Sequence, residues 1–161
     1  MEDLFARLYE VLQRQKEIVG QLYESVEKQI GALRDADLEA LMVAVQGQAN
    51  LAGELARLED ARHAAQAALE AALGLGPDAT LRQILAGAPE DIRDRLKTLG
   101  EELRDDLAAL REANNVCRLM TRRALEFNTR VLQAVGYGGE TTYGAGGEVR
   151  QLIPPAVNRT V

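Results

Sequence analysis

The sequence predicts an all-α protein: an antiparallel bundle or coiled coil of three long helices and one short helix, followed by a flexible tail. Apolar residues recur at spacings of three and four along most of the chain, which is the period of one helix face. Aromatic residues make up only 4% of the chain, so a core of Leu, Ala and Val suits thin helical seams better than an α/β interior. Together these patterns predict a helical bundle over residues 1–135 and a Gly-rich, mostly irregular tail over residues 136–161.

The first helix is expected over residues 2–33. Its apolar side chains form one stripe of an amphipathic helix. Such a helix would be about 48 Å long at 1.5 Å per residue, well beyond the average in globular proteins. The stripe consists of Leu4, Leu8, Val11, Ile18, Leu22, Val26, Ile30 and Leu33.

A second long helix is expected over residues 38–73. Asp35 or Asp37 can cap its first turn by accepting a hydrogen bond from a backbone N–H. Because the connection is short, the two helices should form an antiparallel hairpin. His63 is expected on an exposed face. From Leu38 onward the expected apolar stripe comprises Leu41, Val45, Ala49, Ala52, Leu55, Leu58 or Glu59, Ala65, Leu69 and Leu73.

A short helix over residues 81–86 follows a Gly- and Pro-rich stop. Thr80 can cap it, and its apolar side chains are expected to lie across the end of the hairpin as a lid. Pro89 then favours the start of the last helix, expected over residues 90–135. One side of this helix carries an apolar seam, and the opposite side is charged. The seam consists of Ile92, Leu96, Leu99, Leu103, Leu107 and Leu110.

Past Leu110 the apolar arc widens to about half the helix circumference, more than one coiled-coil seam needs. Two interpretations follow. The hairpin buries this end on two sides, or part of the face remains open to accept another helix. Cys117 is expected to be a small core residue. The residues that would bind another protein are Val116, Met120, Ala124, Phe127, Val131 and Leu132.

Composition argues against several classes of function. The net charge of −6 disfavours nucleic-acid binding, and Arg118, Arg122, Arg123 and Arg130 have no stacking aromatics between them. One Cys and one His provide neither a disulfide framework nor an ordinary zinc site, so no metal or cofactor is expected. Adjacent carboxylates on a helix do not face each other, so no catalytic residue and no enzyme activity is expected. Without a signal peptide or an apolar run that could insert into a membrane, a cytoplasmic protein is expected.

The order of features resembles the FlgN family of flagellar type III export chaperones over nearly the whole chain. The residues that carry the resemblance are DADLEAL at 35–41, LEDAR at 58–62, NNVCRLM at 114–120 and TYGAGG at 142–147. The last two stretches, a C-terminal helix leading into a Tyr-Gly tail, are the most telling.

The resemblance implies a chaperone that binds the C-terminal helices of hook–filament junction proteins. It would prevent their early assembly and deliver them to the export gate protein FlhA. By motif position, the face from Val116 to Leu132 would carry the substrate and Tyr143 would dock to the gate, with Tyr137 as the alternative tyrosine. The alternative function is a structural coiled-coil protein, a homo-oligomer that self-associates through the same face.

Overall fold

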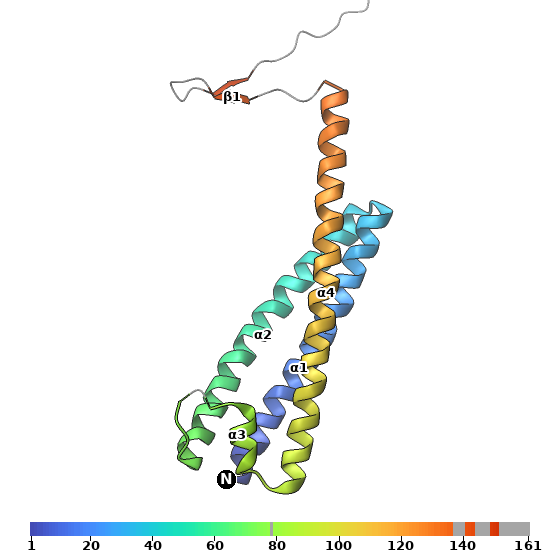
Figure 1. The fold of residues 1–161 in the computed structure, drawn as a ribbon. Helices are drawn as coiled ribbons and strands as arrows, with labels where there is room; N and C mark the ends of the chain where they lie inside the picture. Colours follow the sequence, from blue (N-terminus) through green and yellow to red (C-terminus); the bar gives the residue numbers. More distant parts are fainter. Residues whose placement is uncertain (78, 137–140, 144–148, 152–161) are drawn as a thin grey trace, which may run out of the picture. The chain divides into compact units, whose positions relative to one another are not determined.

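The computed structural model describes residues 1–77, 79–136, 141–143 and 149–151, and within these it consists almost entirely of helix (Figure 1). The all-α prediction of three long helices and one short helix is confirmed. The tail also holds two three-residue strands, an addition to the irregular segment expected there. The elements are α1 (Glu2–Asp35), α2 (Leu38–Leu73), α3 (Leu81–Ala86), α4 (Glu90–Ala134), β1 (Thr141–Tyr143) and β2 (Val149–Gln151).

The connection between α1 and α2 needs only two residues. Ala36 adopts a left-handed conformation (φ 55°), and its backbone N–H donates to Ala32, which closes α1. Asp37 is the N-cap of α2, since its carboxylate accepts a 2.9 Å hydrogen bond from the backbone N–H of Ala40. Of the two candidate caps, Asp37 is therefore the one used.

Polar contacts show that α1 and α2 run in opposite directions. Arg14, early in α1, forms a 2.8 Å ion pair with Glu54, well along α2. Gln48, nearer the start of α2, donates a 2.8 Å hydrogen bond to Gln29, nearer the end of α1. A pair of amides inside a helical seam fixes the register, because a shifted pairing would leave both without partners.

The buried row of α2 differs from the expected stripe. Val45, Ala49 and Ala52 were expected to be buried but are exposed. The row facing α1 is instead offset, and it includes Gln48 and Arg62 beside small and large apolar residues. Between residues 42 and 52, polar and small residues occupy this row while apolar ones occupy the next, so the sequence pattern selects the wrong row there. The other expected residues, Leu41, Leu55, Leu58, Ala65 and Leu69, do belong to the observed row. The observed row is Leu41, Ala44, Gln48, Leu51, Leu55, Leu58, Arg62, Ala65 and Leu69.

The turn after α2 is held by backbone and side-chain hydrogen bonds. Gly74 (φ 66°) ends the helix, and the backbone N–H of Leu75 donates to the carbonyl of Glu70 at 2.9 Å. The buried carboxylate of Glu70 also accepts from the backbone N–H of Ala79 at 2.9 Å. Gln66 donates both to Glu70 and to the carbonyl of Ala79. These contacts fix the return of the chain towards α3.

The short helix α3 begins with a capping box between Thr80 and Gln83. Its junction with α4 is closed by Arg93, whose guanidinium donates to the carbonyls of Leu85 (3.0 Å) and Ala88 (2.8 Å). The helix α4 begins at Glu90, and the carbonyl of Pro89 accepts from the backbone N–H of Arg93. Pro89 therefore precedes the helix rather than forming its first residue.

The helix α4 lies beside α1 and runs in the same direction. The guanidinium of Arg95 lies 4.4 Å from the ring centroid of Tyr9. About two turns further along both helices, Lys16 forms a 2.7 Å ion pair with Glu102. Both pairs keep the same sequence offset, so the two helices stay in register between them.

Two clusters form the core. In the first, α3 packs against α1, α2 and α4, so Ile84 and Leu85 provide the lid expected of this helix. Phe5, which the expected stripe of α1 omits, is fully buried there. The first cluster contains Phe5, Leu8, Leu12, Ala65, Leu69, Ala79, Ile84, Leu85, Ala88, Leu96 and Leu99, and the second contains Ile18, Val19, Leu22, Val26, Leu110, Ala113 and Cys117.

The chain divides into two compact units, residues 1–118 and 119–161, with the boundary inside α4. The first unit contains both core clusters. In the second, β1 and β2 form an antiparallel pair in which Tyr143 lies opposite Val149. The division at residue 135 between bundle and tail stays a prediction. Among the described residues, no helix combines the length and hydrophobicity needed to cross a membrane.

Candidate functional site

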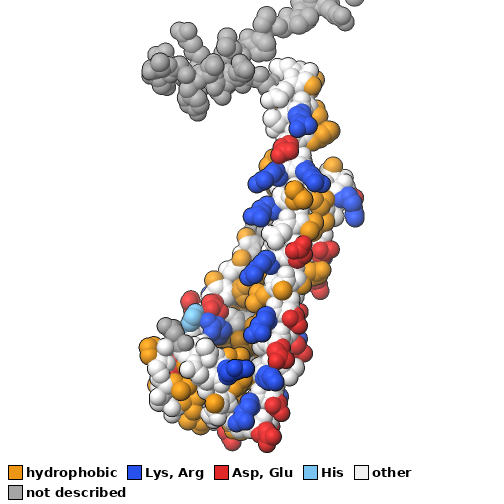
Figure 2. Space-filling view, viewed as in Figure 1, with side chains coloured by type: hydrophobic (Ala, Val, Ile, Leu, Met, Phe, Trp, Pro, Cys, Tyr) orange, Lys and Arg blue, Asp and Glu red, His pale blue; other side chains and the backbone are white. Residues whose placement is uncertain are grey.

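The seam of α4 is buried up to Cys117 and then becomes exposed along the same side of the helix. Leu110, Ala113 and Cys117 belong to the second core cluster. Beyond them Phe127 is 66% exposed and Leu132 is 52% exposed. Figure 2 shows hydrophobic side chains at the surface here, beside Lys and Arg. We call this surface the C-terminal apolar face; it consists of Val116, Met120, Ala124, Leu125, Phe127, Val131, Leu132 and Val135.

All six predicted binding residues lie on this face, although not equally exposed. Met120 and Ala124 are half-buried, whereas Val116, Phe127, Val131 and Leu132 are exposed. Folded proteins rarely expose a contiguous apolar strip to water, and such a strip is typical of a surface that binds a partner. Which of the two interpretations of this end holds stays a prediction.

The other side of this part of α4 carries its charges. Arg122, Arg123 and Glu126 are exposed there, together with Leu119, an apolar residue that is 48% exposed. A helix with one apolar and one charged side can lay the apolar side against another helix while the charges remain in water. Leu119 provides a matched control position on the charged side.

The predicted tyrosine site lies in the tail. Tyr143 is the last residue of β1, and its backbone pairs with that of Val149 in β2. Tyr137 lies outside the described residues. The docking role of Tyr143 therefore depends on the family resemblance and stays a prediction.

A second apolar surface lies on α2, and of its larger residues the sequence pattern assigned only Val45 to the core. Leu38 is 68%, Met42 65% and Val45 46% exposed. These side chains face solvent because they lie on a different side of α2 from the row that packs on α1. One feature of the sequence could have indicated this exposed apolar surface: no Asp, Glu, Lys or Arg occurs between residues 40 and 53, so both sides of the helix are uncharged there.

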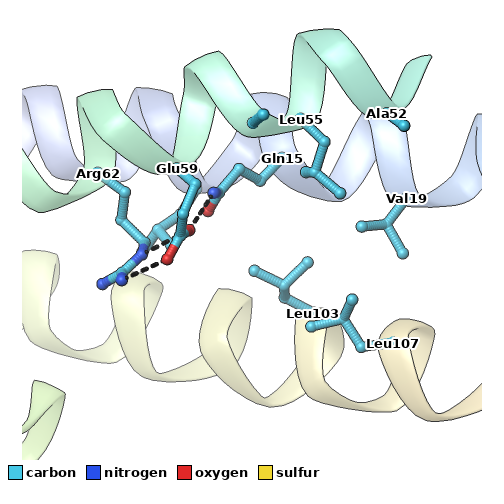
Figure 3. A pocket seen from close by; sticks show the side chains of 10 residues that line it. Gln15, Val19, Ala52, Leu55, Glu59, Arg62, Leu103 and Leu107 are labelled. Atoms are coloured by element: carbon cyan, nitrogen blue, oxygen red, sulfur yellow. Dashed lines mark hydrogen bonds and ion pairs between the residues drawn. The ribbon is translucent and has the colours of Figure 1, made fainter. Parts of the chain in front are cut away.

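An apolar groove of about 570 Å³ lies in the middle of the first unit, between α1, α2 and α4. Figure 3 shows Leu103 and Leu107 of α4 on one side, with Ala52 and Leu55 of α2 on the other. Leu107 is 42% exposed, so the groove is open to solvent. Its polar lining residues, Gln15, Glu59 and Arg62, lie together at one end of the groove and are hydrogen-bonded to one another.

Glu59 closes one end of this groove with an ion pair. Its carboxylate accepts two hydrogen bonds from Arg62 (2.7 and 2.9 Å) and one from Gln15 (2.9 Å). The Arg62 guanidinium lowers the pKa of Glu59 from 4.5 to about 2, and Gln15 acts in the same direction against the opposing effect of desolvation. The group is thus charged at neutral pH and links α1 to α2.

His63 lies beside this pair, with its side chain 64% exposed, as expected for a surface histidine. Within the described part of the chain, no cluster of three or more His, Cys, Asp or Glu side chains could hold a metal ion. Glu102 is bound to Lys16 at the surface, which raises the pKa of that lysine. The ion pair of Glu102 therefore links α4 to α1 at the surface.

Comparison with known proteins identifies one family. A family model described as FlgN protein matches residues 1–151 of the 161. No curated protein and no solved structure matches the chain. The match includes both the helical hairpin and α4 with its C-terminal apolar face.

Proposed function

The chain belongs to the FlgN family of flagellar export chaperones, and we propose that it binds the C-terminal helical segments of hook–filament junction proteins. In this role it would keep these proteins from assembling in the cytoplasm and deliver them to FlhA at the type III export gate. The observation that carries the proposal is the exposure of the C-terminal apolar face on α4. The family consists of chaperones rather than enzymes.

The proposed mechanism is the capture of one amphipathic helix by another. Phe127, Val131 and Leu132 would be buried by the apolar side of the incoming helix, at about 25 cal/mol per Å² before the costs of association. The half-buried Ala124 leaves room for a larger side chain of the partner. The same apolar side of a junction protein would otherwise pair with its neighbours in the filament, so capture and protection are one event.

The first test is a change of Phe127→Asp or Met120→Asp, measured by calorimetry and light scattering with a C-terminal peptide of a junction protein. A buried, unpaired carboxylate should weaken binding by more than about tenfold. Helix content should persist, because Phe127 is 66% exposed. Leu119→Asp is the matched control, since it places the same charge on the charged side of the helix. Equal binding by Phe127→Asp and the wild type would overturn the assignment, as would unfolding of either variant.

The second test separates substrate capture from delivery. Tyr143→Ala is expected to leave peptide affinity unchanged and to reduce export of junction proteins and motility in cells. Tyr137→Ala, assayed in parallel, decides between the two tyrosines. Normal motility of the Tyr143→Ala strain at a wild-type level of chaperone would refute the docking role.

The rival function is a structural coiled-coil protein that self-associates through the C-terminal apolar face. It predicts a mass that rises with protein concentration, falls to the monomer in Phe127→Asp, and does not respond to the junction peptide. A one-to-one complex with the peptide supports the chaperone instead.

A further inference from the structure

The first half of α2 exposes an apolar surface that the proposed chaperone function does not use. Leu38, Met42 and Val45 project into solvent although they are among the larger side chains of the helix. No charged residue occurs between residues 40 and 53. An exposed helix face without charges, in a chain of net charge −6, indicates contact with an apolar partner.

These side chains belong to a second heptad row, distinct from the row that packs on α1. The spacings along it are four, three, four, three and four, and at 100° per residue it stays within about a quarter turn. Every residue of the row is exposed. The row consists of Leu38, Met42, Val45, Ala49, Ala52 and Ala56.

The two ends of the row have opposite shapes. Leu38 and Met42 project at one end, with 68% and 65% of their surfaces exposed. At the other end Ala52 and Ala56 form part of the wall of the apolar groove, facing Leu107 of α4. One end thus provides large apolar side chains. The other end provides an apolar hollow, which Figure 3 shows beside Ala52.

A second copy of the chain fits this surface when the two α2 helices lie antiparallel. Three pairings share Gly47 as their midpoint: Leu38 with Ala56, Met42 with Ala52, and Val45 with Ala49. Each pairing places a large residue opposite a small one, and each joins alternate positions of the heptad, as antiparallel coiled coils require. A parallel pairing would instead put Leu38 on Leu38 and leave the alanine end empty.

We propose that the exposed row of α2 is a self-association surface, in which two copies pair antiparallel about a two-fold axis that passes between Val45 and Ala49, at the level of Gly47. Leu38 and Met42 of each copy enter the groove of the other, against Ala52, Ala56 and Leu107. The interface is isologous, so both hollows are filled by the same contact.

Charge and size set the strength of this contact. Both copies carry a net charge of −6, so they repel each other, while the paired surfaces themselves carry no charge between residues 40 and 53. Added salt screens the repulsion and should strengthen the dimer, the reverse of an interface held by ion pairs. With only three large side chains from each copy, the buried area falls below about 1,200 Å², the range of weak, reversible complexes.

The test is sedimentation equilibrium of the full chain over low to high micromolar concentration. A monomer–dimer equilibrium that tightens with salt is expected. Met42→Glu should raise the dissociation constant by more than about tenfold, because it buries an unpaired charge. Phe127→Asp is the matched control and should leave the equilibrium unchanged. All of these positions are exposed, so circular dichroism should show wild-type helix content.

An exchange of volumes tests the pairing itself. Met42→Ala and Ala52→Met should each weaken the dimer, the first through a void and the second through overpacking. Together they restore a large residue opposite a small one and should recover most of the affinity.

Cysteine cross-linking tests the direction. In a Cys117→Ala background, a mixture of the Val45→Cys and Ala49→Cys variants should form a mixed disulfide faster than either variant alone forms its own. A monomer at every concentration overturns the proposal, as does a dimer that survives Met42→Glu or one that Phe127→Asp abolishes. Faster cross-linking within the Val45→Cys variant alone would show a parallel pairing and equally refute it.

Discussion

At the scale of single residues, Glu59 joins an ion pair within α2 to a hydrogen bond from α1. Its carboxylate receives hydrogen bonds from Arg62 on its own helix and from Gln15 on α1. The pKa of about 2 shows that the folded state favours the charged form. The group therefore stabilises the fold above its unfolded pKa of about 4.5, and this contribution is lost as pH falls towards 2.

Glu59→Gln is expected to lower the free energy of unfolding at pH 7 by about 1 kcal/mol, a value reduced by solvent screening because the Glu59 side chain is 46% exposed. The difference from the wild type should shrink as pH falls from 4.5 to 2, where both proteins carry a neutral group. Urea unfolding at a series of pH values measures it. A difference that stays constant across this range would show that the charge of Glu59 contributes nothing.

At the scale of elements, the stability of α3 comes from its N-terminal cap and its core contact, because the helix is too short to be stable alone. Six residues cannot sustain a helix alone, because the first turn fixes several dihedral angles for one hydrogen bond. The capping box of Thr80 and Gln83 satisfies backbone donors at its start, and Ile84 and Leu85 bury its apolar side in the first core cluster. The cap and the core contact together keep α3 folded.

Thr80→Ala should therefore destabilise the protein by about 1 kcal/mol, while Thr80→Ser, which keeps the hydroxyl, should stay within a few tenths of the wild type. For a protein of this size the alanine variant corresponds to a fall in Tm of about 2–4 °C. Differential scanning calorimetry of the two variants decides it. An equal loss in both would assign the effect to the methyl group of Thr80 rather than to the cap.

The sequence predicted the elements better than their faces. The caps at Asp37 and Thr80 and the stop at Gly74 are local signals, so the limits of the helices follow from neighbouring residues. The phase of α2 does not, because Gln48 occupies its buried row while Val45 occupies its exposed one. Which of two apolar rows is buried depends on the helix that covers it, and that is a property of the tertiary structure.

The candidate site shows the same division. The width of the apolar arc on α4 could be predicted from spacing, since it requires only the helical period. Its exposure could not, because the apolar spacing of Leu110 and Cys117 continues to Val131, and spacing alone does not show which part of a helix face another helix covers.

At the scale of the whole molecule, the core clusters and the proposed binding surface occupy different parts of the chain. Within the described residues, neither core cluster contains a residue beyond Cys117. The C-terminal apolar face lies almost entirely beyond it. Loss of the binding surface should therefore leave the cooperative unfolding of the bundle in place.

A chain that ends after Leu125, two turns past Cys117, is expected to keep the Tm of the full protein and to lose its affinity for the junction peptide. A chain that ends after Gly136 retains the whole apolar face and should bind as the full protein does. Thermal unfolding by circular dichroism and calorimetric titration measure the two properties. A large fall in Tm in the shorter chain would show that the end of α4 contributes to the core.

The continuity of α4 across the boundary between the two units has a kinetic consequence. Starting a helix is the unfavourable step, with a nucleation constant of about 10⁻³, whereas adding residues to an existing helix is nearly neutral. The buried part of α4, through Leu96, Leu99 and Leu110, provides that nucleus permanently. The helix therefore extends from the buried part of α4 into the exposed residues. A partner helix that binds there does not have to meet the conformational entropy cost of forming this part of α4. A free peptide of the same sequence would first have to fold, and would associate more slowly for that reason.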